Sequence, residues 1–134
     1  MSISSIKALL PEVHFERNDS MTAVELFNHE VLRPILKFQS KALCRLTLHY
    51  CFQLNPAYGT LSGTKKRKML NDQLSGNQPL RNQLNGLIIA LFEAEDWTFY
   101  LQHQRDINKR IQAMVQVRIL DQYEKHLPKI VAKD

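Results

Sequence analysis

The histidines, cysteines and carboxylates of the chain are the residue types from which a metal or catalytic site would be built, and their spacing tests for an enzyme. His29-Glu30 begins like the zinc-binding helix motif HExxH, but Arg33 stands where the second histidine ligand belongs. No glutamate has a histidine three residues later, as di-iron helical bundles require. These patterns predict no catalytic residue, no metal site and no cofactor.

The nearest approach to a phosphate-binding loop is the segment 59–66. Only three residues separate Gly59 from Gly63, where the motif has four, and Thr64 stands between the glycine and Lys65. No strand is predicted before this segment, so backbone amides that would hold a phosphate lack a scaffold. We interpret the segment as a loop followed by a helix that Thr64 caps.

Four side chains could converge from distant positions to line a pocket between helices. They are His49, Tyr50, Tyr100 and His103. His49 lies near the apolar side of a predicted helix, where burial would lower the pKa of its imidazole. Cys44 and Cys51 lie on the same helix, about 10.5 Å apart along its axis, too far for a disulfide, so both are expected to be reduced thiols in the core.

Basic residues are spread along the chain. The net charge of +5, with histidines neutral, permits nucleic-acid binding without requiring it. The first cluster, residues 65–68, fills consecutive helical positions and surrounds the helix axis, which is typical of a solvated surface. The second cluster lies on the predicted last helix, within 105–110, and follows aromatic residues at core spacing, which favours packing over base stacking. The candidate contacts with a nucleic acid or an acidic partner are Lys65, Lys66, Arg67, Lys68, Arg105, Lys109 and Arg110.

The elements that must position these residues are helices. Between Pro79 and Pro128 there is no proline and a single glycine, Gly86, and apolar residues recur at helical spacing. No period-two strand pattern with turn residues stands out. The sequence therefore predicts an all-α fold, a single-domain bundle of four to five helices with a long kinked first helix and a long last helix.

Caps and prolines set the expected helix bounds. Thr22 and Glu25 form a capping-box pattern at the start of the first helix, which Pro34 kinks without ending and which stops near Leu54. Three more helices are expected over 64–74, 79–92 and about 94–126, with a tight turn favoured over a continuous helix at 93–96.

The same boundaries divide the chain into an arm, a bundle and a tail. Serines, Pro11 and a polar cluster predict an arm without regular structure. After Pro128 the chain is short and basic, which predicts a frayed end. The predicted regions are an N-terminal arm at 1–20, a helical bundle domain at 21–127 and a C-terminal tail at 128–134.

The composition is that of one globular domain, with 134 residues, 44% hydrophobic and 23% charged. The longest apolar run, 87–92, is far shorter than the roughly 20 residues that span a bilayer. The start of the chain makes a poor secretory signal. We expect no membrane association and a cytoplasmic location.

Two blocks of the sequence, one within 25–37 and the other within 81–111, resemble a family of short, uncharacterised all-helical bacterial proteins, some of which are labelled glyoxalase. Where that family has a threonine cap after the phenylalanine, this chain has Glu93. Metal-dependent glyoxalases of the usual kind present His and Glu ligands from strands, and this sequence predicts no such strands. The resembling residues are Glu25-Leu26-Phe27-Asn28, Leu32-Arg33-Pro34-Ile35-Leu36-Lys37, Arg81-Asn82, Leu84, Gly86, Ile88-Ile89, Phe92, Tyr100 and Asn108-Lys109-Arg110-Ile111.

The leading hypothesis is a non-enzymatic interaction or regulatory module that binds another protein through a helix face. A helix of about 30 residues reaches about 45 Å, longer than a compact domain of this size, so a second copy could cover part of it as a homodimer. Two alternatives stay open. One is a nucleic-acid-binding protein that uses segment 65–68 and the last helix, and the other is a small-ligand carrier or enzyme with a pocket between helices.

Overall fold

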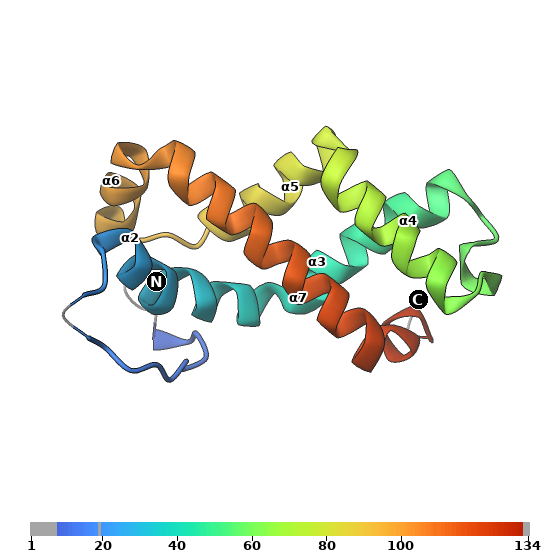
Figure 1. Cartoon of the computed structure of the whole chain (residues 1–134), viewed down its shortest axis with the longest axis horizontal. Coiled ribbons are helices and arrows are strands. Elements are labelled where there is room, and N and C mark those ends of the chain that lie inside the picture. Colours follow the sequence, from blue (N-terminus) through green and yellow to red (C-terminus); the bar gives the residue numbers. More distant parts are fainter. Residues whose placement is uncertain (1–7, 19, 133–134) are drawn as a thin grey trace.

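The computed structural model describes residues 8–18 and 20–132, with side chains through residue 123. Five helices follow one another from Ala23 onward, and the first of them contains a π-helical turn that divides it into two labelled parts (Figure 1). Loops and one short 3-10 turn at Tyr58–Thr60 join the helices, and the described residues contain no strand. The predicted all-α bundle with a long kinked first helix is therefore confirmed. Within these residues, none of the helices combines the length and the hydropathy that a membrane span requires.

The first helix begins where the sequence places its cap. Thr22 Oγ1 accepts a hydrogen bond of 3.1 Å from the backbone N–H of Glu25, and α2 runs over Ala23–Phe27. A side-chain oxygen at this position satisfies an amide that has no partner within the helix. The preceding residues 11–18 have no regular secondary structure, and Phe15 stacks on His29 with ring centroids 4.7 Å apart.

A π-helical turn precedes Pro34. This turn, η1, covers Asn28–Leu32, and α3 follows over Arg33–Leu54. The backbone N–H of Arg33 donates to Asn28 O, five residues back. A proline ring collides with the carbonyl four residues back in a regular helix, and the wider turn displaces that carbonyl. The expected kink thus takes the form of one extra residue just before the proline.

The two middle helices are capped by side chains. Helix α4 covers Gly63–Gly76 and is capped by Ser62, whose Oγ accepts from Lys65 N, so the expected cap at Thr64 is wrong by two residues. Helix α5 covers Gln78–Ile89, with Pro79 in its first turn as expected, and Asn77 Oδ1 accepts from Leu80 N. It ends earlier than the expected residue 92.

The expected last helix is two helices. The predicted turn at 93–96 is confirmed as the start of α6, Ala94–Gln102, where the carboxylate of Asp96 accepts from the backbone N–H of Glu93. The chain breaks again at His103, whose φ of −127° and ψ of 27° are not helical. Helix α7 then covers Gln104–Ala132. Tyr100 and Ile107 are two helical turns apart and fit a continuous helix equally well, so periodicity could not reveal this break.

The expected tail is largely helical. Helix α7 continues through Pro128 to Ala132, so the expected end of the last helix near residue 126 and the frayed tail from 128 are corrected. A proline's fixed φ is itself helical, so a helix can continue past it, although one backbone hydrogen bond is lost and the ring crowds the carbonyl four residues back. The last two residues of the predicted tail lie outside the described part of the chain.

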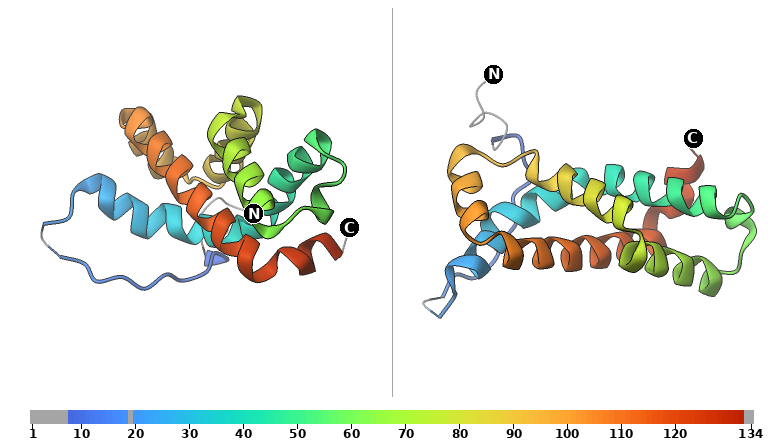
Figure 2. Two further views of the ribbon diagram at one scale, coloured as in Figure 1. Left: turned by 45° about the vertical axis from the view of Figure 1, so that its right-hand side comes forward. Right: turned by 90° about the horizontal axis from the view of Figure 1, so that it is seen from above.

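Helices α3 and α7 pack against each other and cross near the middle of the molecule (Figure 1 and Figure 2). Helix α5 packs on both of them, α6 lies at one end beside α2, and α4 lies toward the other end (Figure 1). Helix α7 contributes one buried row at intervals of four residues, which is the spacing that keeps side chains on one helix face. This row consists of Ile107, Ile111, Val115 and Ile119.

Candidate functional site

Two surface depressions border α7, one on each side of its buried row. The first lies between α5 and α7, has a volume of about 410 Å³, and is called the amide cleft here. The second contains residues of α3 and α7, has a volume of about 510 Å³, and is called the α3/α7 groove. The amide cleft is lined by Gln78, Arg81, Asn82, Asn85, Tyr100, Gln104, Asn108, Lys109 and Gln112.

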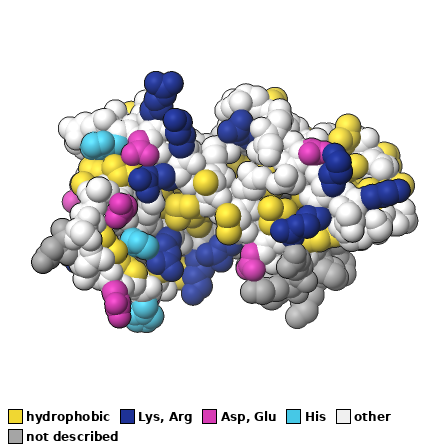
Figure 3. Space-filling model, in the orientation of Figure 1, with side chains coloured by type: hydrophobic (Ala, Val, Ile, Leu, Met, Phe, Trp, Pro, Cys, Tyr) yellow, Lys and Arg dark blue, Asp and Glu magenta, His cyan; other side chains and the backbone are white. Residues whose placement is uncertain are grey.

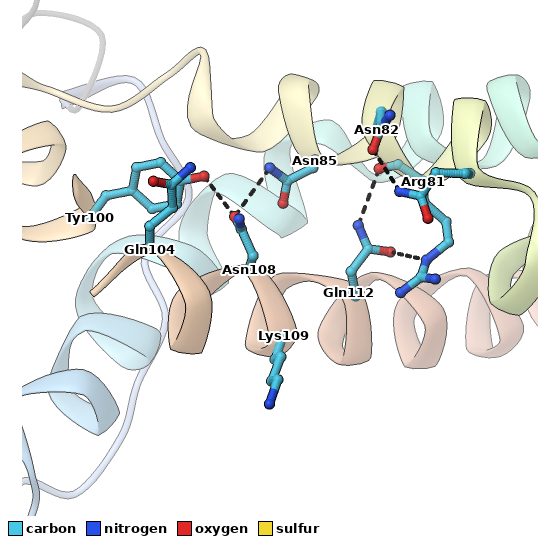
Figure 4. Close-up of a pocket in the computed structure, with 9 residues that line it drawn as sticks. Arg81, Asn82, Asn85, Tyr100, Gln104, Asn108, Lys109 and Gln112 are labelled. Atoms are coloured by element: carbon cyan, nitrogen blue, oxygen red, sulfur yellow. Dashed lines mark hydrogen bonds between the residues drawn. The ribbon is translucent and has the colours of Figure 1, made fainter. Parts of the chain in front are cut away.

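One end of the amide cleft is organised around Asn108. Its Oδ1 accepts hydrogen bonds from the Tyr100 hydroxyl at 2.6 Å and from Asn85 Nδ2 at 3.3 Å (Figure 4). Asn108 thereby ties α5 and α6 to α7. Asn85 Oδ1 is buried and has no hydrogen-bond partner among the described residues. An unsatisfied buried acceptor costs about 1–3 kcal/mol, so this amide is held at the expense of stability.

The other end of the amide cleft is organised around Arg81. The side chain extends from α5 toward α7, where its Nε donates to Gln112 Oε1 at 3.3 Å (Figure 4). Gln112 Nε2 donates in return to the backbone oxygen of Arg81 at 3.1 Å, and Arg81 Nη1 donates to Ser75 O at 3.3 Å. These bonds fix the guanidinium on a half-buried side chain.

The charge of the amide cleft is uncompensated. Its lining contains no carboxylate, and the cation that faces it is the guanidinium of Arg81, since the side chain of Lys109 points away from α5 (Figure 4). The oxygens that hold the guanidinium of Arg81 are a carboxamide and a backbone carbonyl, and both are neutral. The cleft can therefore accept a negative charge together with neutral hydrogen-bonding groups.

The α3/α7 groove has a different chemistry. Its apolar lining includes Leu36, which is buried, and Val117, which is 70% exposed. An exposed valine beside a buried leucine gives a partner apolar surface to cover. The full lining is Arg33, Leu36, Ala113, Met114, Val117, Arg118 and Asp121.

Cations flank this groove. Arg33 and Arg118 line it, and Lys37 and Lys41, both exposed, follow Arg33 on α3 at intervals of four residues. Side chains at this spacing are neighbours on a helix surface. Figure 3 shows Lys and Arg side chains gathered next to hydrophobic ones in the middle of the molecule. An apolar strip with a predominantly cationic border results, in which Asp121 is the one carboxylate of the lining.

The two cysteines do not form a reactive site. Both are free thiols and buried, as expected. Burial raises the pKa of Cys44 to about 11, although the charge of Arg118 opposes this, and burial raises the pKa of Cys51 to about 12. Burial also raises the pKa of Tyr58 well above its usual value. Because the thiolate is the nucleophile, neither cysteine is activated at neutral pH.

The four side chains expected around one pocket lie apart. Tyr100 reaches the amide cleft, but Tyr50 donates instead to Gln83 Oε1, at 2.9 Å. His49 is exposed and packs against Tyr50 edge to face, and His103 lies against Phe99 at the break between α6 and α7. Only Tyr100 of the four lines a described pocket.

The two basic clusters also lie apart. The hydroxyl of Tyr123 bonds to Gly63 O at 3.4 Å, which puts segment 65–68 beside the later part of α7. Lys109 is about 20 Å earlier along that helix. Two of the expected basic contacts have local acidic partners, since Lys68 pairs with Asp72 at 2.9 Å and Arg110 with Asp106 at 3.1 Å. Arg105, the remaining candidate on α7, is exposed.

Sequence reasoning missed the carboxamides of the cleft. They recur at helical spacing on both walls, which is a signal that the sequence carries. Gln78, Asn82 and Asn85 lie on α5, and Gln104, Asn108 and Gln112 lie on α7. Polar residues at helical spacing normally face solvent, so the pattern does not show by itself that the two rows face each other.

Comparisons with protein-family models, curated proteins and solved structures give no match. The resemblance to a family of helical bacterial proteins therefore stays a prediction. In the part of the chain that the structure describes, no three His, Cys, Asp or Glu side chains come close enough together to hold a metal ion.

Proposed function

We propose that the protein is a non-enzymatic binding module that holds an acidic amphipathic helix of a partner protein in the α3/α7 groove. The observation that carries this proposal is the apolar strip with cations beside it. Val117 offers an exposed apolar contact, and Arg33 and Arg118 stand at its edge. An amphipathic helix inserts its apolar side chains into such a groove, and carboxylates on its flanks would meet the cations.

The dimensions fit a short helical segment. The lining positions on α7 run from Ala113 to Asp121, about 12 Å or two helical turns. A segment of this length has room for two or three apolar anchors. Such a small contact is typical of weak and transient association. Because the border is cationic and the net charge is +5, a second copy of this chain would bring like charges together.

The test is a titration with designed helical peptides, monitored by fluorescence anisotropy. The acidic peptide has leucines at helical spacing and glutamates elsewhere, and a matched peptide has lysines in place of the glutamates. We expect the acidic peptide to bind with a dissociation constant in the micromolar range and more weakly as salt is raised. Equal binding of both peptides, or of neither, would overturn the proposal.

Two variants and a control locate the contact. Val117→Gln removes the exposed apolar group, and Arg118→Gln removes one bordering charge. Each should weaken binding of the acidic peptide by about tenfold, or about 1.4 kcal/mol. Arg105→Gln makes the same charge change on α7 outside the groove lining and should leave binding unchanged.

Other occupants would give different results. If sedimentation shows a dimer that Val117→Gln dissociates, a second copy covers the groove instead. If single-stranded DNA displaces the acidic peptide and its own binding depends more steeply on salt, a nucleic acid is the occupant. Either result contradicts the proposal.

A further inference from the structure

The amide cleft is a second site with its own chemistry, on the other side of α7 from the groove. We propose that it binds a small hydrophilic molecule that carries a phosphate or carboxylate group. Arg81 would receive the anionic group, and the carboxamides around Asn108 would hydrogen-bond its hydroxyl or amide groups. This inference does not depend on the proposed function of the groove.

The guanidinium of Arg81 is held in place before any ligand arrives. Gln112 bonds both its Nε and its backbone oxygen, and Ser75 O holds Nη1. An arginine fixed by neutral acceptors keeps its full charge and still has N–H groups to donate. Guanidinium groups bind phosphate and carboxylate through paired hydrogen bonds, so an anion would supply the compensating charge.

The negative charge that we expect of the ligand follows from the absence of carboxylates in the cleft lining. Its lining contains no carboxylate, so a cationic ligand would meet the charge of Arg81 without a counter-charge. A purely apolar ligand would strip water from the carboxamides without replacing their hydrogen bonds. A hydrophilic anion is the class that satisfies both the charge and the amides.

The rest of the cleft suits neutral polar groups. Asn108 Oδ1 already accepts two hydrogen bonds, while its Nδ2 makes none within the described residues. This amide can donate to a ligand oxygen. Gln104 adds a further amide to the same wall (Figure 4). A carboxamide both donates and accepts, which suits the hydroxyl groups of a sugar or polyol.

The test uses nuclear magnetic resonance of the full chain labelled with nitrogen-15. The probes are glucose 6-phosphate, gluconate and, as the neutral control, glucose. We expect saturable shifts of the side-chain amides of Asn85 and Asn108 and of the Arg81 Nε–H with at least one anionic probe, at a dissociation constant of about 1 mM or lower. Glucose should cause none at the same concentration. The two anionic probes distinguish a phosphate from a carboxylate as the recognised group.

Variants of one residue and a matched control complete the test. Arg81→Gln should abolish the saturable shifts at Asn108, and Arg81→Lys should retain weakened binding because it keeps the charge without the paired geometry. Arg105→Gln removes an equal charge outside the cleft and should bind as the parent does.

Three outcomes would overturn the proposal. One is the absence of saturable shifts in the unaltered chain, which requires no variant to fold. The second is anion binding centred on segment 65–68, which would indicate general attraction to lysines. The third is unchanged binding by Arg81→Gln.

Discussion

The two sides of α7 differ in the groups that they leave accessible. Toward α5 the helix presents carboxamides that bond across the amide cleft, as Asn108 does to Asn85. Toward α3 it presents Val117 and Met114 with Arg118 beside them. Both sides flank the same buried row. One helix can therefore secure the core and still offer two surfaces of unlike chemistry.

The difference also separates two kinds of stabilisation. Apolar burial beside the groove is nondirectional and scales with area. The bonds across the cleft are directional and fix which residues of α5 and α7 face each other, as the reciprocal contact between Arg81 and Gln112 illustrates. Mutations can therefore affect both sides together, or one without the other.

The largest effect is expected from Ile111→Ala, which should destabilise both sides of α7 together. Ile111 is fully buried in the row between them. Its truncation should lower the free energy of unfolding by about 2–5 kcal/mol, since the transfer term and the cavity add. Denaturant unfolding measures this. Val117→Ala on the same helix is the control, expected to cost less than about 0.5 kcal/mol because the side chain is exposed. Equal losses would contradict this assignment of the core.

Alkaline pH should weaken the fold through groups on α3. Folding raises the pKa of Cys44 and Cys51 from 9.0 to about 11 and about 12, so the unfolded chain releases these protons first. The contribution of each thiol is fully present below pH 9 and is lost as the pH rises toward the folded value. We expect the free energy of unfolding to fall by about 3 kcal/mol in total between pH 8 and pH 10.

The control for the alkaline effect is the double variant Cys44→Ala, Cys51→Ala. Its free energy of unfolding should change much less between pH 8 and pH 10. The carboxamides of the cleft do not titrate in this range and should contribute nothing. An equally steep decline in the double variant would assign the effect to other groups.

A smaller and one-sided effect is expected from Tyr100→Phe. The change removes the hydroxyl that donates to Asn108 at 2.6 Å and leaves the ring in place. The free energy of unfolding should fall by about 1 kcal/mol, while peptide binding in the groove should not change. Tyr50→Phe, which removes a bond to Gln83 at an exposed position, is the matched control and should cost less. A larger loss for Tyr50→Phe would run against the described burial.

The smallest effect, and one of opposite sign, is expected from Asn85→Ala. The variant loses a 3.3 Å bond to Asn108 but also removes a buried oxygen for which the described part of the chain supplies no partner. Alanine also has the higher helix propensity. Stability should stay the same or rise by up to about 1 kcal/mol. Asn82→Ala, at an exposed position on the same helix, is the control for the part of the change that comes from helix propensity. A loss above about 1 kcal/mol would mean that this amide stabilises the fold.

The candidate site was predictable only in part. Tyr100 and Lys109 were named from the sequence and line the amide cleft. The reasons for naming them differ from what they do there, because Tyr100 was expected beside His49 and Lys109 beside other cations. The amide of Asn108 carried no signal of its own, since an asparagine on a helix surface is ordinary unless its partners are known.

The sequence by itself determined what depends on neighbours along the chain. The spacing of apolar residues made the chain helical, the Thr22 cap began the first helix, and the carboxylates at 93–96 marked the start of α6. These are short-range effects, since a cap bonds to an amide three residues away and a helical face repeats within four.

Only the tertiary structure decided which faces meet. It broke the chain at His103 and set the amides of α5 opposite those of α7. The physical reason is that each of these outcomes depends on packing between helices distant in sequence. A helical pattern fixes the face on which a residue lies, and the fold determines what that face contacts.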